Sequence, residues 1–431
     1  TGAGADTLLV RIIRMVQQAQ GSKAPVQRIA DRIASVFVPT VIGLSALTFV
    51  LWLVIGGEAY FSHALLSAVS VLVIACPCAL GLATPTALMV GIGRGAENQI
   101  LIKDAAALEQ MCRIDTMVLD KTGTLTEGRP SVTEWIDVVP PSDGLYDAVY
   151  SAEMKSEHPL ASAVTAYLAG RGARHREVDS FESLTGRGIA FRCDGASYWI
   201  GSRALLETRD VRPSVELLAR IDRLEQEGAG TVFVGQDDRL LSVVVVSDPL
   251  KETTREALEQ LRRRHIRLVM LTGDNRRAAA ALAGRLDIDD FRAEMMPDDK
   301  EQYVRRLQAE GRRVAMTGDG INDSQALARA DVSIAMGRGT DVAMDVAMIT
   351  LMNSDLSLLP KAYALSRSTV RLIRENLFWA FVYNLIGIPI AAGALYPLCG
   401  LLLSPMLAGA AMAFSSVSVV ANSLRLKWKK L

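Results

Sequence analysis

Long apolar stretches without charged side chains stand out along the chain, and they come in two pairs. The first pair is residues 34–57 and 64–93, and the second lies within residues 376–424, which contain no Asp, Glu, Lys, Arg or His. Because a helix needs about twenty apolar residues to cross a bilayer, the last segment has room for two spans, with a break near Tyr396–Gly400. The pattern predicts four transmembrane α-helices. Buried helices of a soluble protein are the alternative, and the tight pairing argues against it.

Basic residues flank the predicted spans on one side only. Because Lys and Arg collect on the cytoplasmic side of a membrane, this side is predicted to be cytoplasmic. The chain is therefore expected to be an integral protein of the cell or inner membrane, with the lipid bilayer as a partner and its soluble parts in the cytoplasm. The basic residues before the first and third spans and after the second and fourth are Arg11, Arg14, Lys23, Arg28, Arg32, Arg94, Lys103, Arg371, Arg374, Arg425, Lys427, Lys429 and Lys430.

The segment before the first span has a helical period. Asp6 or Thr7 can cap a helix, and the apolar residues Leu8, Leu9, Ile12, Ile13 and Val16 form one stripe on it. Residues 1–33 are predicted to form a cytoplasmic amphipathic linker helix.

About 280 residues separate the two predicted pairs of spans, too many for a typical single domain. Strand-like runs at 116–119, 267–271, 313–316 and 332–336 alternate with helical patterns, which predicts a parallel sheet with crossover helices. Residues 128–246 have a different pattern: a helix after Pro159 and short strands near 189–192, 197–200 and 240–246. They are predicted to form an α+β insert in an α/β domain.

Composition narrows the functional class. The chain has 431 residues, 50% of them hydrophobic, with a mean hydropathy of +0.23 and a formal net charge of zero. A neutral chain has no strong field for nucleic acid, so none is expected as a partner. Five scattered cysteines are not typical of a disulfide framework.

The run Asp120-Lys121-Thr122-Gly123-Thr124-Leu125-Thr126 follows the first predicted strand of the α/β domain. A carboxylate fixed by a strand can act as a nucleophile, and amides and hydroxyls of the following loop can face phosphate oxygens. An Asp that merely begins a turn or helix is the alternative, but it does not require this order of residues. The run resembles the phosphorylation signature of P-type ATPases, which predicts that Asp120 accepts a phosphoryl group from ATP.

Two later strands also end in acidic loops. They are Thr272-Gly273-Asp274 and Thr317-Gly318-Asp319-Gly320-Ile321-Asn322-Asp323. Because such loops converge at the carboxyl edge of a doubly wound sheet, they are expected to surround Asp120. Singly, each loop could be an ordinary turn or helix start. The expected catalytic residues are Asp120, Lys121, Thr122, Thr124, Thr272, Gly273, Asp274, Lys300, Asn322 and Asp323, and the expected Mg²⁺ ligands are Asp120, Thr122 through its carbonyl, Asp319 and Asp323.

The order and spacing of these loops resemble the P-type ATPases throughout the soluble block. The resemblance implies a haloacid-dehalogenase-like α/β phosphorylation domain that uses ATP and Mg²⁺. This chain departs from the family pattern at Ser324-Gln325, where the family usually has Ala-Pro.

The insert has residues suited to a purine nucleotide. His158 precedes Pro159, which holds it extended at a helix entry, and glycines two apart allow a close backbone approach. A capped helix plus a turn is the plainer interpretation of these residues. Within this architecture they resemble the nucleotide-binding domain of heavy-metal-transporting P-type ATPases. The expected nucleotide-binding residues are Glu153, Glu157, His158, Gly186 and Gly188.

Cys76-Pro77-Cys78 lies inside the second predicted span. Residues two apart do not share a face of a regular helix, so both sulfurs can reach one ion only if the proline distorts the helix. Thiolates select soft ions such as Cu(I), or Zn²⁺ and its heavier congeners. Two buried cysteines beside a kink are the alternative.

The last two spans carry no charged ligand, whereas a divalent ion usually needs one beside two thiolates. The span residues Tyr383, Asn384, Met412 and Ser416 together with Cys76 and Cys78 resemble the copper-exporting branch of the family. That resemblance predicts ATP-driven Cu(I) export through an aspartyl phosphate, with a cytosolic copper chaperone as a further candidate partner. A Zn²⁺- or Cd²⁺-transporting ATPase is the alternative within the family.

The family also has an actuator domain whose Thr-Gly-Glu loop helps hydrolyse the aspartyl phosphate, and no Thr-Gly-Glu occurs in these 431 residues. The chain is thus expected to be a partial enzyme without the actuator domain and first spans. Its alternative is a membrane-anchored nucleotide- and metal-binding fragment that does not turn over. The expected organisation is 1–33 linker helix, 34–104 helix pair with Cys-Pro-Cys, 105–127 and 247–360 phosphorylation domain, 128–246 nucleotide-binding domain, and 361–431 helix pair with a basic tail.

Overall fold

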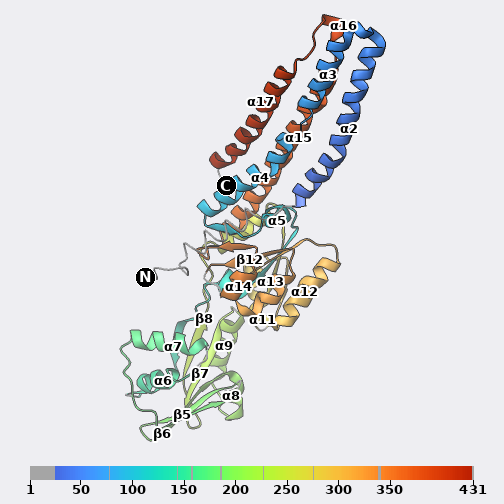
Figure 1. Ribbon diagram of the computed structural model, residues 1–431. Helices are drawn as coiled ribbons and strands as arrows, with labels where there is room; N and C mark the ends of the chain where they lie inside the picture. Colours follow the sequence, from blue (N-terminus) through green and yellow to red (C-terminus); the bar gives the residue numbers. More distant parts are fainter. Residues whose placement is uncertain are drawn as a thin grey trace.

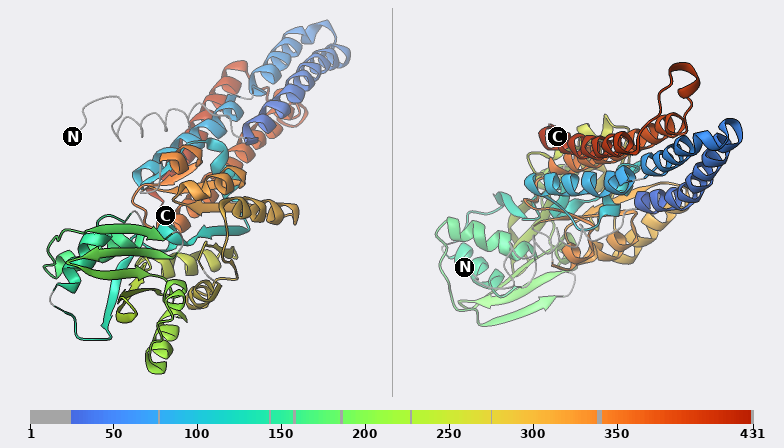
Figure 2. Two further views of the ribbon diagram at one scale, coloured as in Figure 1. Left: turned by 90° about the horizontal axis from the view of Figure 1, so that it is seen from below. Right: turned by 45° about the horizontal axis from the view of Figure 1, so that its top comes forward.

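The computed structural model describes residues 25–429, apart from residues 77, 143, 157–158, 185–186, 227, 275 and 338–340 (Figure 1). At a few further positions, Cys78 among them, only the backbone is described. A helical bundle lies at one end of the molecule and a six-stranded sheet at the other, and a seven-stranded sheet lies between them (Figures 1 and 2).

The bundle is built from the apolar stretches, because a helix satisfies its own backbone hydrogen bonds in an apolar environment. Its helices are α2 (Pro25–Gly56), α3 (Phe61–Ile74), α4 (Cys78–Glu97), α15 (Leu358–Ala391) and α17 (Pro405–Leu424). Short helices lie at its ends: η1 (Glu58–Tyr60), α16 (Tyr396–Cys399) and η4 (Arg425–Trp428). The predicted second span is two helices, α3 and α4, which are broken at the Cys-Pro-Cys run as its proline predicts.

Three helical stretches of the described chain are long and apolar enough to cross a membrane: Arg32–Gly56, Glu58–Glu97 and Pro405–Trp428. The predicted third span lies in the second half of α15, a 34-residue helix whose first half packs in the core of the central sheet. Four spans remain a prediction, because the part of α15 that follows Glu375 is short and includes the polar residues Asn376 and Asn384.

The central sheet has the order β1-β13-β12-β11-β2-β9-β10. Its strands pair in parallel except for β1 with β13, so crossover helices are required and cover both faces. One face packs against α5, α10, α11 and the bundle helices α4 and α15, and the other against α12, α13 and α14. The strands are β1 (Ile100–Ile102), β2 (Thr116–Asp120), β9 (Arg267–Leu271), β10 (Asp290–Arg292), β11 (Val314–Gly318), β12 (Val332–Met336) and β13 (Ile349–Leu351). The helices are α5 (Ala105–Met111), α10 (Thr254–Arg262), α11 (Arg276–Arg285), α12 (Pro297–Ala309), α13 (Ser324–Arg329) and α14 (Asp341–Val346).

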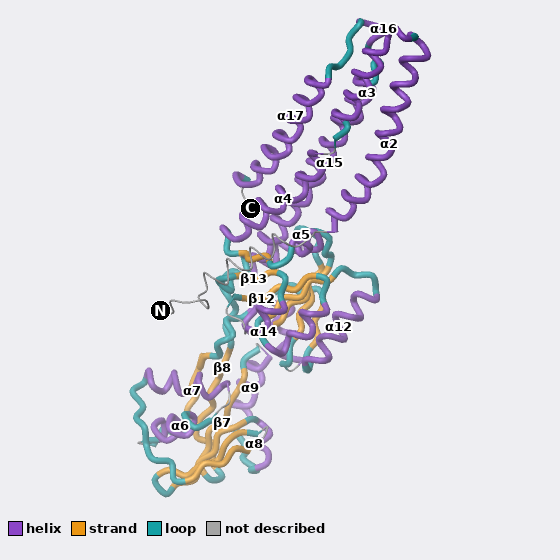
Figure 3. The backbone as a smooth tube through the Cα atoms, viewed as in Figure 1, coloured by secondary structure: helices purple, strands orange, loops and turns teal. Residues whose placement is uncertain are grey.

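The second sheet is antiparallel, in the order β3-β8-β7-β6-β5-β4, and appears as a separate strand-rich body in Figure 3. Helices α6 and α7 cover one of its faces, and α8 and α9 cover the other. Its strands are β3 (Ser131–Asp137), β4 (Ser180–Leu184), β5 (Gly188–Cys193), β6 (Ala196–Gly201), β7 (Gly230–Gln236) and β8 (Arg239–Ser247). Its helices are α6 (Leu145–Glu153), α7 (Pro159–Gly170), α8 (Arg203–Thr208) and α9 (Val215–Gln226).

Two chain segments join the sheets, and they are bonded to each other. Thr126 and Leu250 form an isolated antiparallel bridge, and Thr126 Oγ1 donates to Asp248 Oδ2 over 2.6 Å. Residues 131–247 therefore form an inserted α+β body that leaves and returns to the α/β domain beside Asp120.

Candidate functional site

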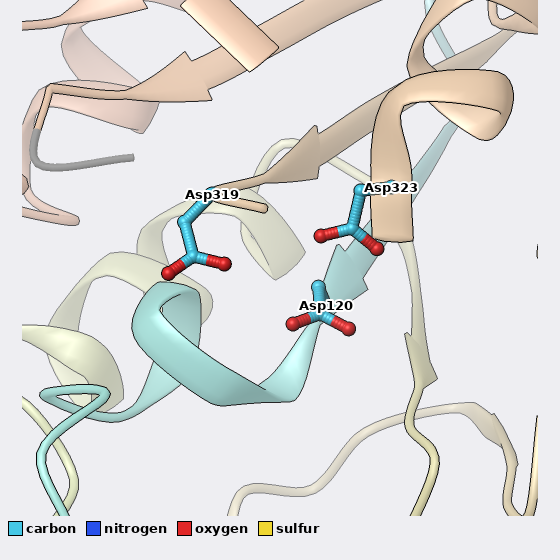
Figure 4. A group of neighbouring side chains, drawn as sticks. All are labelled: Asp120, Asp319 and Asp323. Atoms are coloured by element: carbon cyan, nitrogen blue, oxygen red, sulfur yellow. The ribbon is translucent and has the colours of Figure 1, made fainter. Parts of the chain in front are cut away.

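Three acidic loops meet at the carboxyl edge of the central sheet. Strand β2 ends at Asp120 and lies between β9 and β11, so the loops that follow these neighbours flank it. The carboxylates of Asp120, Asp319 and Asp323 face one another, with one oxygen of each within 4.8 Å of the others (Figure 4). The sheet order thus brings together residues that are about 200 positions apart in the sequence.

Lys300 offsets part of this negative charge. It projects from α12, and its Nζ lies 2.6 Å from Asp120 Oδ1 and 2.7 Å from Asp323 Oδ1. All three side chains are buried. Burial raises the pKa of Asp120 to about 7, with a further increase from Asp323 that Lys300 opposes. Burial and Asp323 likewise raise the pKa of Asp319 to about 6. A cation beside these carboxylates would favour their ionised forms.

The loop after Asp120, Lys121–Leu125, is kinked, because the backbone is not helical at Thr122 and Gly123. Gly123 has φ +73, and a Cβ there would lie 1.6 Å from Asp319 Oδ2, so only glycine lets the loop approach this carboxylate. Thr124 Oγ1 is buried and has no hydrogen-bond partner among the described residues. An unpaired hydroxyl beside Asp120 is available to a phosphate oxygen.

The second acidic loop contacts the first. Lys121 forms an ion pair with Asp274, and Thr272 Oγ1 accepts a hydrogen bond from the Asp274 amide over 3.1 Å. Thr272 is buried, whereas Gly273 is exposed. Thr122 and Asn322 are exposed too. The structure thus places all ten expected catalytic residues around this sheet edge, and their individual roles remain predictions.

Mg²⁺ is the cofactor expected from the sequence, and the donor set fits it. Mg²⁺ prefers carboxylate oxygens, and it shares its coordination shell with water and substrate phosphates. Asp120, Asp319 and Asp323 supply clustered carboxylate oxygens, of which Lys300 engages one on Asp120 and one on Asp323. These three residues can hold the ion, and the expected contribution of the Thr122 carbonyl remains a prediction.

Lys251 is a site residue that the sequence reasoning missed. It lies in the segment that returns from the insert to the central sheet. Its side chain is buried, and Nζ donates to the Gly123 carbonyl over 2.5 Å. It thus fixes the loop on the side facing Asp319. The sequence signal was only its position three residues after Asp248, because a buried lysine cannot be told from a surface lysine without the fold.

A cavity of about 570 Å³ in the insert contains the described part of the expected nucleotide site. Glu153 lines it and is buried, which raises the pKa of its carboxyl to about 7. Gly188 also lines it, and a Cβ there would lie 2.0 Å from the Ile200 carbonyl. The pairing of β5 with β6 therefore requires this glycine, whether or not a nucleotide binds. Lys155, which the sequence reasoning missed, adds a basic group to the lining. The expected residues Glu157, His158 and Gly186 lie outside the described residues.

The expected ion site lies where α3 ends and α4 begins. Cys76 is half-buried there, packed in an apolar cluster that includes Ile74, Ala75 and Met412. The backbone of Cys78 is described, but its side chain is not.

The other expected ion ligands differ in their exposure. Asn384 is buried, and its Oδ1 has no hydrogen-bond partner among the described residues, as suits a ligand. Tyr383 is 44% exposed, which is less typical of an ion ligand, and its role remains a prediction. Ser416 is half-buried, whereas the neighbouring Ser415 is buried and its Oγ has no hydrogen-bond partner in the described part of the chain. Ser415 is therefore a better candidate than the predicted Ser416.

Comparison with known proteins agrees with this geometry. The haloacid dehalogenase-like hydrolase family matches residues 114–331. A copper-exporting P-type ATPase of Legionella pneumophila is 48% identical over 424 residues, which cover 98% of this chain and 58% of that protein. A silver exporting P-type ATPase of Salmonella typhimurium is 48% identical over 430 residues, which cover 99% of this chain and 52% of that protein.

A solved structure resembles the chain along nearly its whole length. A zinc-transporting PIB-type ATPase in its E2.Pi state superposes with a TM-score of 0.79 and 31% identity, covering 99% of this chain and 68% of the other. The chain spans a little over half the length of the two curated relatives. Sequence identity, the hydrolase match and the superposition agree with the geometry around Asp120, and the chain therefore belongs to the PIB-type class of the P-type ATPases.

Proposed function

We propose that the intact protein exports Cu(I) across a membrane, driven by ATP through an aspartyl phosphate at Asp120. The observation that carries this proposal is the buried Asp120 carboxylate at the end of β2, contacted by Lys300 and clustered with Asp319 and Asp323. This is the arrangement that a carboxylate nucleophile needs for phosphoryl transfer in a member of this family.

In the proposed reaction, an Asp120 oxygen attacks the γ-phosphorus of ATP. The new bond joins this oxygen to phosphorus, the bond from phosphorus to the bridging oxygen breaks, and ADP leaves with that electron pair. Mg²⁺, when bound, neutralises charge on the phosphate oxygens. Lys300 keeps the nucleophile in place, and the Thr124 hydroxyl and loop amides can donate to the transferred group.

ATP would reach Asp120 from the insert. The cavity beside Glu153 has room for a purine, and Lys155 and Arg187 in its lining can contact phosphate oxygens. The hinge at Thr126 and Asp248 then has to bring this cavity toward Asp120. Hinge closure of this kind is common among enzymes that sequester their reaction from water.

Cu(I) is the proposed cargo rather than Zn²⁺ or Cd²⁺. Two cysteines and a buried thioether at Met412 suit a soft monovalent ion, and Asn384 and Ser415 add no charge of the kind that a divalent ion usually needs. Two curated relatives are named for copper and silver, which are both soft monovalent ions. A zinc transporter shares the fold at 31% identity, and Zn²⁺ is therefore the competing ion in the test.

The test is acid-stable labelling of the reduced, bilayer-reconstituted chain with γ-³²P-ATP, in the presence of Cu(I), Zn²⁺ or a chelator. Labelling that requires Asp120 and increases with Cu(I), but not with Zn²⁺, supports the proposal. Cys76→Ser should remove the increase, whereas Cys399→Ser, at an exposed cysteine in α16, should keep it. Labelling that survives Asp120→Asn, or a response to Zn²⁺ alone, contradicts the proposal.

A further inference from the structure

A buried network of polar side chains joins α4, α15 and α17 between the expected ion site and the central sheet. Asn376 of α15 is its centre, and its side-chain amide nitrogen donates to Ser423 Oγ of α17 over 2.8 Å and to the Ala83 carbonyl of α4 over 3.3 Å. Its side-chain oxygen accepts from Asn422 Nδ2 over 2.8 Å. Asn376 and Ser423 are both 1% exposed. In an apolar bundle such groups are costly unless paired, so the network holds the three helices in one register.

The network contacts α4 on both sides of Pro85. The Ala83 carbonyl lies two residues before the proline, and Thr86 follows it, with its Oγ1 3.1 Å from Ser423 Oγ. Proline lacks an N–H, so it leaves the Gly81 carbonyl without its helical partner and weakens the helix there. Thr86 Oγ1 also donates to the Leu82 carbonyl over 2.6 Å. Side chains thus contact α4 at the Ala83 and Leu82 carbonyls, next to the Gly81 carbonyl that Pro85 leaves without its helical bond.

The position of Pro85 gives this support a consequence. Helix α4 begins at Cys78, in the expected ion site, and ends at Glu97, just before β1 of the central sheet. Helix α15 begins in the core of that sheet and carries Asn384 in its second half. A force that passes between the sheet and the ion site along α4 must cross the weak point at Pro85. A helix free to bend there would absorb the displacement instead of transmitting it.

We infer that Asn376 is a positioning residue that braces α4 at Pro85, so that α4 and α15 move together and couple ion occupancy to phosphorylation of Asp120. The coupling part of this inference rests on the proposed function, but the brace itself does not. Asn376 does not contact the phosphorylation site and is not one of the expected ion ligands. Its role is to keep the register of α4 against α15 and α17.

The brace is tested first by hydrogen exchange of the backbone amides in residues 79–90, with the reduced chain in lipid nanodiscs. Asn376→Leu should speed exchange there about fivefold or more, as expected for the loss of one or two buried hydrogen bonds. The matched control is Ser70→Ala, which removes a 2.6 Å hydrogen bond from buried Ser70 of α3 to the Leu403 carbonyl. Unchanged exchange in Asn376→Leu, or an equal increase in the control, overturns the inference.

The coupling is tested by the ratio of ³²P-labelling rates with Cu(I) and with a chelator. Asn376→Leu should lower this ratio about fivefold or more, the lower end of typical coupling between two sites, while labelling with the chelator stays within about twofold. A merely structural role would lower both rates together. If the unaltered chain shows no response to Cu(I), the proposed function fails, and the exchange experiment still decides the brace.

A second substitution tests whether Pro85 is the reason that α4 needs the brace. Pro85→Ala restores the missing N–H and stiffens α4 by itself, so in the double variant with Asn376→Leu both the exchange rate and the labelling ratio should return to those of Pro85→Ala alone. A double variant as impaired as Asn376→Leu contradicts the inference. If Asn376→Leu does not fold, Ser423→Ala removes the hydroxyl between Asn376 and Thr86 with a smaller change, and the same outcomes apply.

Discussion

At the residue scale, the site consists of three clustered carboxylates with a buried lysine between two of them. Lys300 contacts Asp120 and Asp323, which are both buried. Removing one partner of a buried ion pair leaves an uncompensated charge, which is more costly than losing an exposed pair. Lys300 is therefore expected to be necessary both for the nucleophile and for the local fold.

Lys300→Met should lower labelling of Asp120 by about 100-fold or more, because breaking a buried ion pair costs about 3–5 kcal/mol. The measurement is the initial rate of acid-stable ³²P incorporation, with thermal unfolding followed in parallel. The control is Arg305→Met, at an exposed position on α12, which should keep labelling within about twofold. Full labelling in Lys300→Met would show that Asp120 does not depend on it.

Glu153 predicts a pH dependence in the insert. Burial raises the pKa of Glu153 to about 7, so below this pH it is neutral and can donate a hydrogen bond to a purine nitrogen. As the pH rises through 7 it becomes a buried carboxylate and loses that donor. ATP affinity, measured by calorimetry from pH 6 to 8.5, should therefore fall severalfold across this range.

Glu153→Gln keeps a neutral donor at every pH and should flatten this profile. Glu207→Gln, at an exposed position on α8, should leave the profile unchanged. A profile as steep in Glu153→Gln as in the unaltered chain would rule out Glu153 as the titrating group. The stability of the fold should also decrease as the pH rises. The raised pKa of Glu153 stabilises the folded state fully below the ordinary pKa of a glutamate, and this contribution is lost as the pH rises through 7.

From the sequence alone, a site residue could be recognised where the residues around it form a known motif. Asp120, Asp274 and Asp319 each follow a strand-like run, and their chemistry could be inferred from that position. Lys251 and Ser415 could not be chosen as candidates in this way, because only their burial in the fold distinguishes them from surface residues. Tyr383 was predicted as an ion ligand from resemblance, yet its side chain is 44% exposed.

At the element scale, the loop after β2 is shaped by one glycine. Gly123 has a left-handed conformation, φ +73, and lies against Asp319. A side chain at this position would have both an unfavourable backbone conformation and a clash with a carboxylate that is itself fixed by β11. The loop cannot yield without moving Thr124 or Thr126, whose Oγ1 lies 3.0 Å from the Lys121 carbonyl oxygen.

Gly123→Ala should therefore reduce labelling by about 100-fold or more while the chain stays folded, because strain at such a site costs about 1–3 kcal/mol and the clash adds to it. The matched control is Gly170→Ala at the end of α7, where a Cβ meets nothing within 4 Å. Labelling rate and circular dichroism together make the measurement. Normal labelling in Gly123→Ala would show that the loop is looser than its contacts indicate.

The boundaries of a helix or strand could be predicted where one hydrophobic period or a proline determined them. Strands β9 and β12 coincide with predicted runs, and the break between α3 and α4 falls at the Cys-Pro-Cys run. Helix α15 was less predictable, because it is continuous from the core of the central sheet into the bundle and its apolar half carries Asn376 and Asn384. The absence of charged residues cannot show where a helix begins when the helix runs from the core of a sheet into an apolar bundle.

At the scale of the whole molecule, continuous helices join the central sheet to the place proposed for the ion. Helix α4 leads from Cys78 to the edge strand β1, and α15 leads from the core of the central sheet to Asn384. The insert contacts this frame through the hinge beside Asp120. The sheet order, which sets Asp120 between the loops at 272–274 and 319–323, follows from strand pairing between distant segments, and the alternating pattern predicted only its class.

The central claim is that Asp120 itself accepts the phosphoryl group. Borohydride reduction of the chain after brief exposure to Mg-ATP converts an aspartyl phosphate to homoserine, which peptide mass spectrometry locates. The account predicts homoserine at position 120, absent without ATP and absent in Asp120→Asn. Homoserine at another aspartate, or an unmodified Asp120 in a chain that carries acid-stable label, would contradict it.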